Sequence, residues 1–245
     1  MGVMQRLLDV QSKDTHCDQL RYQLDHHETI TARDGLVARL REHDQLLGAV
    51  TGQRDELSAR QRPLDEAVRQ CEQKIAKDSE ALYSGAVTAH KDLEALQHEM
   101  AAQKERQGQF EDQILELMEA AEPLDVRLEQ LGADRVLLVA DLERAEEALT
   151  IARAEIEAEL AAEESGRAAL AEGLPADLLA QYESIRRGAG GQGAALLAPG
   201  GRCEGCHLTL PRAEYERLKR APADEVVQCP ECGRILVRTP APTPT

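Results

Sequence analysis

Aromatic residues are almost absent from this sequence. Its 245 residues include one Phe, four Tyr and no Trp, so that only 2% of the chain is aromatic. Globular cores and ligand pockets depend on large aromatic side chains, and their scarcity argues against a compact enzyme. The chain also has no Gly-rich phosphate loop, no H-E-x-x-H and no nucleophile elbow. We therefore expect a protein that is not an enzyme.

Long apolar runs are missing as well. No segment approaches the 18 or more consecutive apolar residues that a membrane span requires. The N-terminus carries Arg6, Asp9 and Lys13 and lacks the uninterrupted apolar core of a signal peptide. Two of the six cysteines, Cys17 and Cys71, stand alone, and this usage fits a reducing compartment better than a disulfide framework. The sequence thus predicts a cytoplasmic protein that does not enter a membrane.

The composition is instead rich in Ala, Leu, Glu, Gln and Arg, with 30% charged residues and a net charge of −16. This composition is typical of long helices and coiled coils. Residues 1–181 hold 20 basic and 38 acidic side chains, a net charge of −18, whereas residues 182–245 hold 9 and 7, a net charge of +2. The acidic and the near-neutral parts are therefore expected to be separate bodies.

An apolar residue recurs at alternating steps of three and four residues through two long segments. Ten of the fourteen repeat positions between residues 36 and 82 are apolar, as are sixteen of twenty between residues 93 and 159. A period of 3.5 residues over so many heptads predicts a left-handed coiled coil. Ser84-Gly85 is a reversal point, so the two arms can pair antiparallel within one chain, with the tip near residues 83–88.

The repeat breaks between residues 24 and 36, which predicts a separate N-terminal helix over roughly residues 4–28, beside the far end of the second arm. Thr31, with Asp34 three residues later, is expected to cap the restart of the first arm at residue 34.

Prolines and glycines mark the remaining boundaries. Pro63 and Pro123 each remove a backbone donor within an arm. Because the apolar repeat continues through both prolines, we expect a local kink at each. The alternative is a short break at each proline, after which a new helix begins. Pro175 is tolerated at the start of a further short helix, and six residues rich in glycine then predict a flexible linker. The expected domains are the helical region 1–173, a short helix 174–187, the linker 188–193, a zinc ribbon 194–238 and a disordered tail 239–245.

The ribbon is predicted from two C-x-x-C pairs, Cys203 with Cys206 and Cys229 with Cys232, which are separated by 22 residues. This spacing lets both thiolates of a tight turn point at one ion, and two such turns supply the four tetrahedral sulfur ligands of one structural Zn²⁺. Residues 194–198 and 235–238 are expected to form flanking strands, and residues 211–219 a short helix. Four thiolates leave no open coordination position, so the zinc is not expected to be catalytic.

Three other chemistries use similar cysteines. Cys203-Glu-Gly-Cys206-His207 matches the haem attachment motif, but that chemistry needs export and leaves the second pair unexplained. A rubredoxin-like iron site uses the same four thiolates, yet the aromatic shell typical of it is missing. A thioredoxin-like redox pair needs a βαβ context that the sequence lacks. His207 is expected at the surface or next to the ligands, not as a fifth ligand.

Four stretches of the sequence carry a resemblance to a known family, and the last two of them together are specific to it. They are residues 7–11 (LLDVQ), residues 82–85 (LYSG) followed by 91–97 (KDLEALQ), residues 203–211 (CEGCHLTLP) and residues 229–236 (CPECGRIL). With them, nearly the whole chain resembles the bacterial C4-type zinc-ribbon family built on a long coiled-coil hairpin, and its high Ala and Arg content is similar to that of actinobacterial members. The resemblance implies zinc held by the four cysteines and no established enzymatic activity. It also implies a role in binding nucleic acid or protein, since the better-studied relatives are reported as RNA-binding or chaperone-like adaptors.

The expected fold is therefore mainly α, with a long antiparallel coiled-coil hairpin and a small C-terminal zinc ribbon of β-strands. In the first functional hypothesis, the ribbon binds nucleic acid or the transcription machinery and is mounted on a rigid coiled-coil arm. The candidate contacts are Arg202, Arg212, Tyr215 (as a stacking group), Arg217, Lys219, Arg220, Arg234 and Arg238. Because residues 194–245 hold six carboxylates against seven cations, such binding should be weak and sensitive to salt.

In the second hypothesis, the protein is an adaptor or chaperone that binds protein partners through the hairpin, while the ribbon is structural or docks a protein. The candidate contacts at the tip are Tyr83, Ser84, Gly85 and Val87. Residues 83–173 carry 8 basic and 22 acidic side chains, which leaves an acidic face for a basic partner. A monomer is expected because the hairpin closes within one chain.

Overall fold

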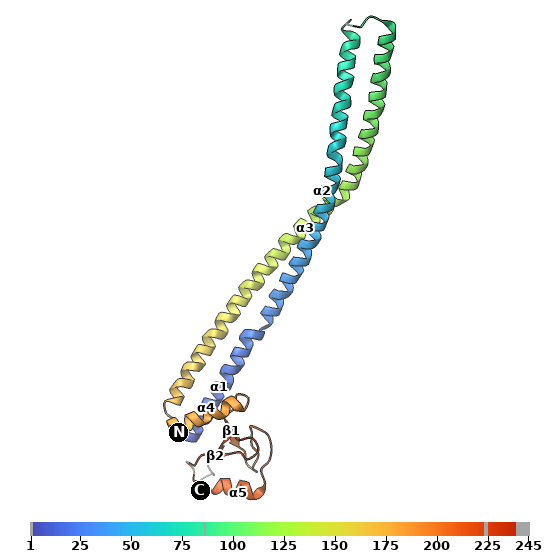
Figure 1. The fold of residues 1–245 in the computed structure, drawn as a ribbon. Coiled ribbons are helices and arrows are strands. Elements are labelled where there is room, and N and C mark those ends of the chain that lie inside the picture. The colour runs from blue at the N-terminus through green and yellow to red at the C-terminus, as the bar shows by residue number, and fades with distance from the viewer. Residues whose placement is uncertain (1, 86, 223–224, 239–245) are drawn as a thin grey trace. The chain divides into compact units, whose positions relative to one another are not determined.

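The computed structural model describes residues 2–85, 87–222 and 225–238, and Figure 1 shows their course. Within these residues the elements are α1 (Val3–His26), α2 (Glu28–Tyr83), α3 (His90–Ala171), α4 (Ala176–Gly188), β1 (Ala194–Leu197), α5 (Arg212–Arg220), β2 (Val227–Gln228) and β3 (Ile235–Arg238). The chain divides into two compact units, Arg33–Ala145 and the remainder, and each is described by itself.

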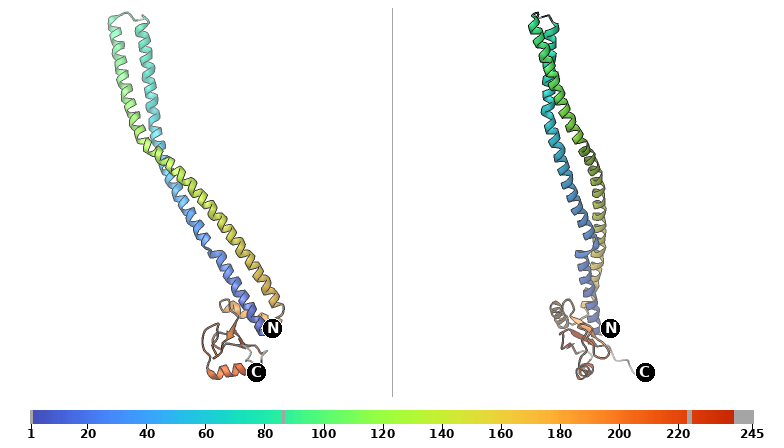
Figure 2. Two further views of the ribbon diagram at one scale, coloured as in Figure 1. Left: turned by 180° about the vertical axis from the view of Figure 1, so that it is seen from behind. Right: turned by 90° about the vertical axis from the view of Figure 1, so that its right-hand side faces the viewer.

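The unit Arg33–Ala145 consists of the facing parts of α2 and α3, which lie side by side in both views of Figure 2. All fourteen repeat positions of the first arm are buried or half-buried, as are fifteen of the sixteen second-arm positions between residues 93 and 145. The predicted long coiled-coil hairpin is thereby confirmed, because the apolar repeat of the sequence is the face that the two helices bury against each other.

Two ion pairs join the arms. Arg135 Nε lies 2.7 Å from Asp44 Oδ1, and Arg54 Nε lies 2.7 Å from Asp125 Oδ1. In each pair the two residue numbers add up to the same value, so both pairs correspond to one antiparallel register. Arg54 and Arg135 are polar exceptions in the apolar repeat, and pairing across the arms is how the hairpin accommodates them.

The prolines do not end the helices. The helix α2 continues through Pro63, and α3 continues through Pro123, which excludes the alternative of a break at each proline.

The predicted start of the first arm is wrong. The helix α2 begins at Glu28, so Thr31 lies inside it and caps nothing. The cap is His27, whose Nδ1 accepts a hydrogen bond from the backbone N–H of Thr29 at 3.3 Å and whose carbonyl accepts one from Ile30 at 3.0 Å. The capping rule favours the side-chain oxygens of Ser, Thr, Asp and Asn. The sequence analysis therefore did not predict a cap at a histidine, whose ring nitrogen accepts the same kind of hydrogen bond.

The other unit contains α1, the end of α3, α4 and the ribbon. As predicted, α1 lies beside the end of the second arm: Lys13 Nζ is 2.8 Å from Glu163 Oε2, and Arg21 is 2.6 Å from Glu164 Oε1. Here the repeat shifts by one residue, because Glu159 is exposed while Leu160 is half-buried.

The three strands form one small sheet in the order β1-β3-β2. The strand β1 pairs in parallel with β3, and β2 pairs antiparallel with β3. The strands and helix predicted around the cysteines correspond to β1, β3 and α5. The strand β2 was not predicted, since two residues are too few to show an alternating pattern.

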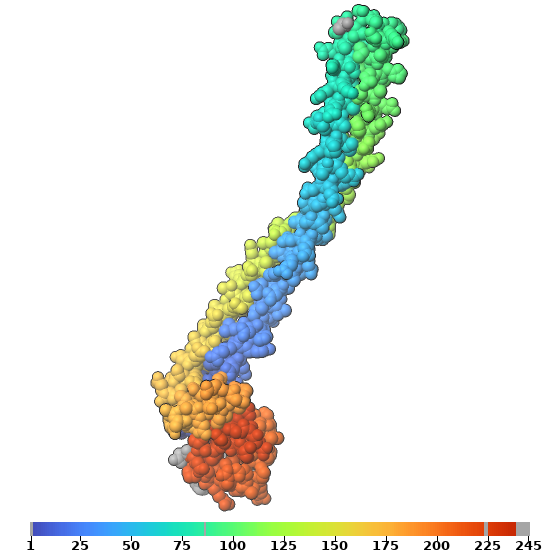
Figure 3. Space-filling model, viewed as in Figure 1, coloured from blue at the N-terminus to red at the C-terminus, as the bar shows by residue number. Residues whose placement is uncertain are grey.

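One apolar core joins the ribbon to the helices of the same unit. It contains Leu7 and Val10 from α1, Leu174, Leu178 and Tyr182 from the α4 region, and Ala194 and Ile235 from the sheet. Figure 3 shows α4, in orange, packed directly against the ribbon, in red. The first turns of the chain and the ribbon therefore share a hydrophobic interior.

A buried polar network centred on Gln11 lies beside this core. The Gln11 Oε1 atom accepts hydrogen bonds from the backbone N–H groups of Gly193 (2.7 Å) and Ala194 (3.2 Å), and its Nε2 donates to the carbonyl of Gly191 (3.1 Å). The Tyr182 hydroxyl donates to Asp14 Oδ2 at 2.7 Å. Burial, together with this hydrogen bond, raises the pKa of Tyr182 well above its ordinary value, so the hydroxyl keeps its proton.

The glycine-rich segment 188–193, predicted to be a flexible linker, is held by these contacts. Besides the bonds to Gln11, the carbonyls of Ala189 and Gln192 accept hydrogen bonds from Arg234 at 2.8 and 3.1 Å. Gly193 is required because a Cβ atom there would lie 2.5 Å from the carbonyl oxygen of Tyr182. The glycines serve close packing and tight turning, which composition alone does not distinguish from flexibility. The predicted tail, residues 239–245, lies outside the described residues.

Candidate metal centre

The four ribbon cysteines stand on two tight turns with the same hydrogen-bonding pattern. In the first turn the N–H of His207 donates to the carbonyl of Cys203 at 2.7 Å, and in the second the N–H of Gly233 donates to that of Cys229 at 2.8 Å. The residue after each pair has a positive φ, 61° at His207 and 72° at Gly233. Glycine adopts this conformation without strain, whereas histidine does so at some cost.

The turns bring the four sulfur atoms of Cys203, Cys206, Cys229 and Cys232 within 4.8 Å of one another. Cys203 Sγ lies 3.9 Å from Cys232 Sγ, and Cys206 Sγ lies 3.9 Å from Cys229 Sγ. With zinc–sulfur bonds of about 2.3 Å, the sulfurs of a regular tetrahedron are about 3.8 Å apart. The cluster is thus suited to bind one zinc ion, as the spacing in the sequence predicted.

Two of these cysteines are buried and two are half-buried. Burial raises the pKa of the Cys203 thiol and raises that of Cys229 to about 12. Burial acts in the same direction on Cys232, but hydrogen bonds from Arg234 and the neighbouring thiols lower its pKa to about 7. Zinc binds thiolates, so metal binding must release protons from this cluster.

His207 stands apart from the cluster. Its side chain is 63% exposed and its Nδ1 lies 3.2 Å from Arg202 and 3.8 Å from Glu204. It is therefore a surface residue next to the site, whereas the ribbon interior behind the cysteines is formed by Ala195, Leu197, Leu210, Leu218, Val227 and Leu236.

Comparison with known proteins agrees with this geometry. Residues 10–190 match the model of the CT398-like coiled coil hairpin domain. The chain belongs to the CT398-like hairpin family. Residues 202–236 of this CT398-like protein also match the C4-type zinc ribbon domain. Both matching families are coiled-coil and zinc-ribbon types and not enzyme families.

Related proteins are similar over much of the CT398-like chain. The uncharacterized protein MT2288 of Mycobacterium tuberculosis is 42% identical over 164 residues, which cover 66% of this chain and 65% of the relative, just under two thirds of its length. A solved structure from Mycobacterium smegmatis has a TM-score of 0.88 at 28% identity and covers 96% of this chain and 97% of the other. The structure of CT398 from Chlamydia trachomatis has a TM-score of 0.52 at 20% identity, covering 97% and 98%, which shows a likeness of fold.

Two of the predicted contact residues of the ribbon serve its internal structure. The guanidinium of Arg238 donates to the carbonyls of Leu218, Ala221, Pro222 and Glu225 at 2.5–2.9 Å. Arg234 donates to the carbonyls of the 188–193 segment, as described above. Backbone carbonyls distant in sequence gave no signal from which these roles could be predicted.

Two more of the predicted contacts have partners within the ribbon. Arg217 forms a two-pronged ion pair with Glu214 of the same helix, at 2.6 and 2.9 Å. Tyr215 is half-buried against the ribbon core, and its ring faces Gly201 so closely that a Cβ there would lie 3.0 Å away. The ring face that stacks on a base would therefore have to be the one turned away from Gly201.

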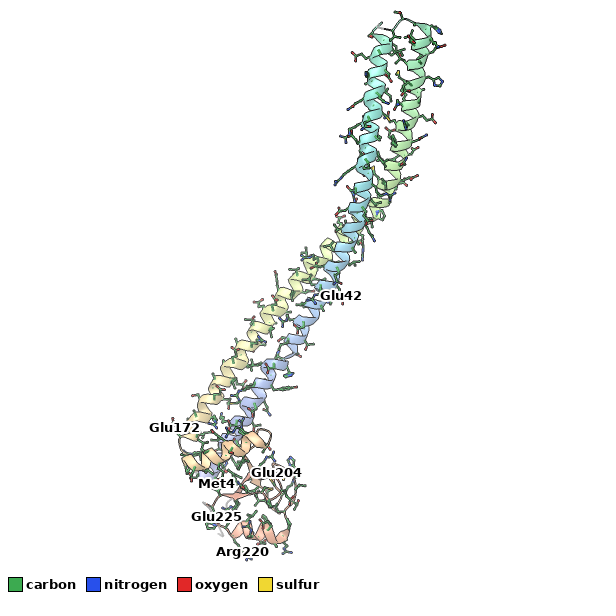
Figure 4. All side chains as sticks on the ribbon, in the orientation of Figure 1. Met4, Glu42, Glu172, Glu204, Arg220 and Glu225 are labelled. Atoms are coloured by element: carbon green, nitrogen blue, oxygen red, sulfur yellow. The ribbon has the colours of Figure 1, made fainter. Side chains whose placement is uncertain are left out.

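The remaining cations are exposed. Arg212, Lys219 and Arg220 stand on α5, and none of them has an ion pair within the described residues. Figure 4 labels Arg220 near the end of α5. Arg202 is also exposed and lies 3.8 Å from Glu204.

At the hairpin tip, α2 ends at Tyr83 and α3 begins at His90. The side chain of Tyr83 is 80% exposed, Gly85 has a φ of 73°, and Val87 is half-buried. Ser84 donates a hydrogen bond to the carbonyl of Ala81 at 3.4 Å. No helix within the described residues is long and apolar enough to cross a membrane.

Sequence reasoning missed Gln11 and Asp14, which tie α1 to the ribbon. Their only signal is position, since both lie among the apolar residues Leu7, Val10 and Cys17 at helical spacing. A polar residue inside such a face suggests a buried hydrogen-bond network.

Proposed function

We propose that this protein is a non-catalytic, zinc-stabilised scaffold of the cytoplasm whose ribbon binds nucleic acid, as a transcription-associated factor would. The observation that carries the proposal is the arrangement of cations on α5. At about 100° per residue, Arg212, Lys219 and Arg220 fall within one third of the helix circumference, while the buried Leu218 lies on the other side. The helix thus presents a cationic face, which we call the α5 face.

The strength of this binding follows from the charges. Glu216 lies within the α5 face and offsets part of its charge, and Arg217, Arg234 and Arg238 are engaged elsewhere. Three cations that neutralise three phosphates of a single strand give a slope of about −2 in a plot of log affinity against log salt concentration. Weak, salt-dependent binding to single strands is therefore the expected behaviour.

The test is a fluorescence anisotropy titration of the zinc-loaded protein against single-stranded RNA, single-stranded DNA and duplex DNA at several salt concentrations. The variant Arg212→Gln/Lys219→Gln/Arg220→Gln should lose binding. A matched control, Arg39→Gln/Arg60→Gln/Arg62→Gln on α2, changes the net charge equally at exposed positions and should retain it. Substitution is preferable to removal of the ribbon, because the ribbon shares a core with α1. Absence of binding at low salt, or equal loss in both variants, contradicts the proposal.

A second candidate function, a protein adaptor, is favoured by the exposure of Tyr83 at the tip. Exposed aromatic side chains are frequent anchors of protein interfaces. A photo-crosslinking amino acid placed at Tyr83 should give a defined protein product in cells, whereas the same probe at the exposed Tyr22 on α1 is the control. A product specific to position 83 that persists in the α5-face variant supports the adaptor. Identical products at both positions contradict it.

A further inference from the structure

Large apolar side chains are exposed along one part of α3. Leu115, Met118, Val126, Val136 and Leu137 have exposed fractions between 51% and 69%, and we call this group the α3 stripe. All five belong to the unit Arg33–Ala145. Apolar residues scattered singly on a surface are ordinary; what distinguishes these five is that they lie along one side of a single helix.

The α3 stripe follows the helix axis. Leu115, Val126 and Leu137 are spaced by eleven residues, and eleven residues make slightly more than three full turns of an α-helix. These three side chains therefore lie in one nearly straight row about 33 Å long at ~1.5 Å per residue. The positions facing α2 are taken by other residues, such as the buried Leu117 and Leu131, so the stripe is additional to the coiled-coil core.

Carboxylates lie in the same row between the apolar side chains. Glu119, Glu122 and Glu129 are exposed and have no ion pair within the described residues. Residues 115–137 contain six acidic and two basic side chains, a net charge of −4. One of the two, Arg135, pairs with Asp44 on α2. The α3 stripe is thus apolar and acidic, with few cations of its own.

We propose that the α3 stripe is a docking surface for a basic amphipathic helix of a partner protein. A helix with apolar residues on one face can follow a straight apolar row of this length, and Lys or Arg side chains beside that face can reach the carboxylates. A second copy of this chain is a poor occupant, because the stripe is acidic and the chain carries a net charge of −16. The proposal goes beyond the nucleic-acid function, since the stripe includes neither the α5 face nor the tip.

The test uses the full-length, zinc-loaded protein and a labelled synthetic helical peptide of about 24 residues, which spans about 36 Å. The peptide has leucines along one face and lysines on both sides of them, and a second peptide with the same residues in scrambled order serves as its control. We expect the amphipathic peptide to bind more tightly than the scrambled one in an anisotropy titration. The variant Leu115→Ser/Leu137→Ser should weaken binding by about tenfold for each substitution.

Matched variants on α2 distinguish peptide binding at the α3 stripe from unspecific attraction of the basic peptide to an acidic protein. Val37→Ser/Leu46→Ser replaces two exposed apolar side chains and should leave the affinity unchanged. Glu119→Gln/Glu122→Gln/Glu129→Gln should weaken binding, whereas Glu42→Gln/Glu56→Gln/Glu72→Gln, with the same change in charge, should not. Circular dichroism should show equal helicity in all variants, because every substituted side chain is exposed.

Three outcomes overturn the proposal. The first is failure of the amphipathic peptide to bind better than the scrambled peptide. The second is equal weakening by the α2 and α3 variants, which indicates unspecific electrostatic attraction. The third is concentration-dependent self-association in analytical ultracentrifugation that Leu115→Ser/Leu137→Ser abolishes, because a second copy then covers the stripe.

Discussion

At the scale of single residues, Gln11 has a structural role that its position in the sequence does not reveal. Its amide group satisfies the N–H groups of Gly193 and Ala194 and the carbonyl of Gly191, and all of these lie on the segment that enters the ribbon. A buried backbone donor that loses its acceptor costs as much free energy as a typical core mutation. Gln11 therefore determines how firmly α1 and the ribbon are joined.

Gln11→Ala should lower the free energy of unfolding by about 2 kcal/mol, because it leaves buried backbone groups without partners. Urea denaturation monitored by circular dichroism, with zinc present, measures the change. Gln5→Ala, at an exposed position of the same helix, is the control and should change the stability little. Equal stability of the Gln11 and Gln5 variants would show that water replaces the lost acceptor.

The two cysteine turns offer a comparison within one molecule. His207 and Gly233 occupy the same place in their turns, both with positive φ. Gly233→Ala should lower the free energy of unfolding of the ribbon by about 1 kcal/mol, since a residue with a Cβ atom is strained in this conformation. His207→Gly should not destabilise the ribbon, because it relieves the same strain. Calorimetry of the zinc-loaded variants gives both values, and a loss of stability in His207→Gly would mean that the contacts of its ring outweigh the strain.

At the scale of the elements, β3 holds the end of α5 through Arg238. The last carbonyls of a helix lack partners within the helix, and a cation at that end also complements the helix dipole. Here the guanidinium of Arg238 reaches the carbonyls of Leu218 and of the residues that follow α5.

Arg238→Ala should destabilise the ribbon by about 2 kcal/mol. Arg212→Ala, which removes an equal charge from the exposed face of α5, should leave the stability unchanged and weaken only the binding of nucleic acid. Parallel thermal melts and anisotropy titrations distinguish the two effects. If Arg238→Ala retains full stability and loses binding, then Arg238 acts as a contact residue and not as a structural one.

The coiled-coil core contains a histidine with no visible partner. His43 occupies a core position of the first arm, and both of its ring nitrogens are buried without a hydrogen-bond partner within the described residues. His43→Leu should raise the free energy of unfolding by about 1 kcal/mol, because it replaces unsatisfied polar atoms by an apolar side chain at a position that favours leucine. Chemical denaturation measures the gain. A loss of stability would mean that water reaches the ring or that leucine does not fit there.

The elements also show how far the sequence predicts the structure. The apolar repeat located both arms and nearly all of their buried positions, because burial of one helical face is a local property of the sequence. The spacing of the cysteines predicted the metal cluster because each pair lies on one tight turn, which is also a local feature of the sequence. The cap at His27 was missed because the capping rule does not favour histidine, and the strand β2 because it is too short to show a pattern. The structural roles of Arg234 and Arg238 depend on partners distant in sequence. Hydrogen bonds to a remote backbone carbonyl leave no pattern in the residue that donates them, so these two roles could not be predicted.

At the scale of the whole molecule, a hydrophobic core extends from the ribbon into the helices of the same unit. Leu7 and Val10 of α1 share a core with Ala194 and Ile235 of the sheet, and Gln11 bonds to the segment that precedes β1. The arms between Arg33 and Ala145 form a separate compact unit. Zinc bound by the four cysteines is therefore expected to stabilise α1 and α4 as well as the ribbon.

Removal of zinc by a chelator, or the substitution Cys229→Ser, should therefore unfold more than residues 194–238. Structural zinc contributes directly to folding free energy, and the helices that share its core lose their packing partner when the ribbon unfolds. Hydrogen exchange followed by mass spectrometry should show faster exchange in α1, α4 and the ribbon, with unchanged protection between Arg33 and Ala145. Restoring zinc to the chelated protein should restore protection in all three, whereas Cys229→Ser should not respond. Protection of α1 that is independent of zinc would mean that α1 and α3 hold together without the ribbon, and that the shared core contributes little to their stability.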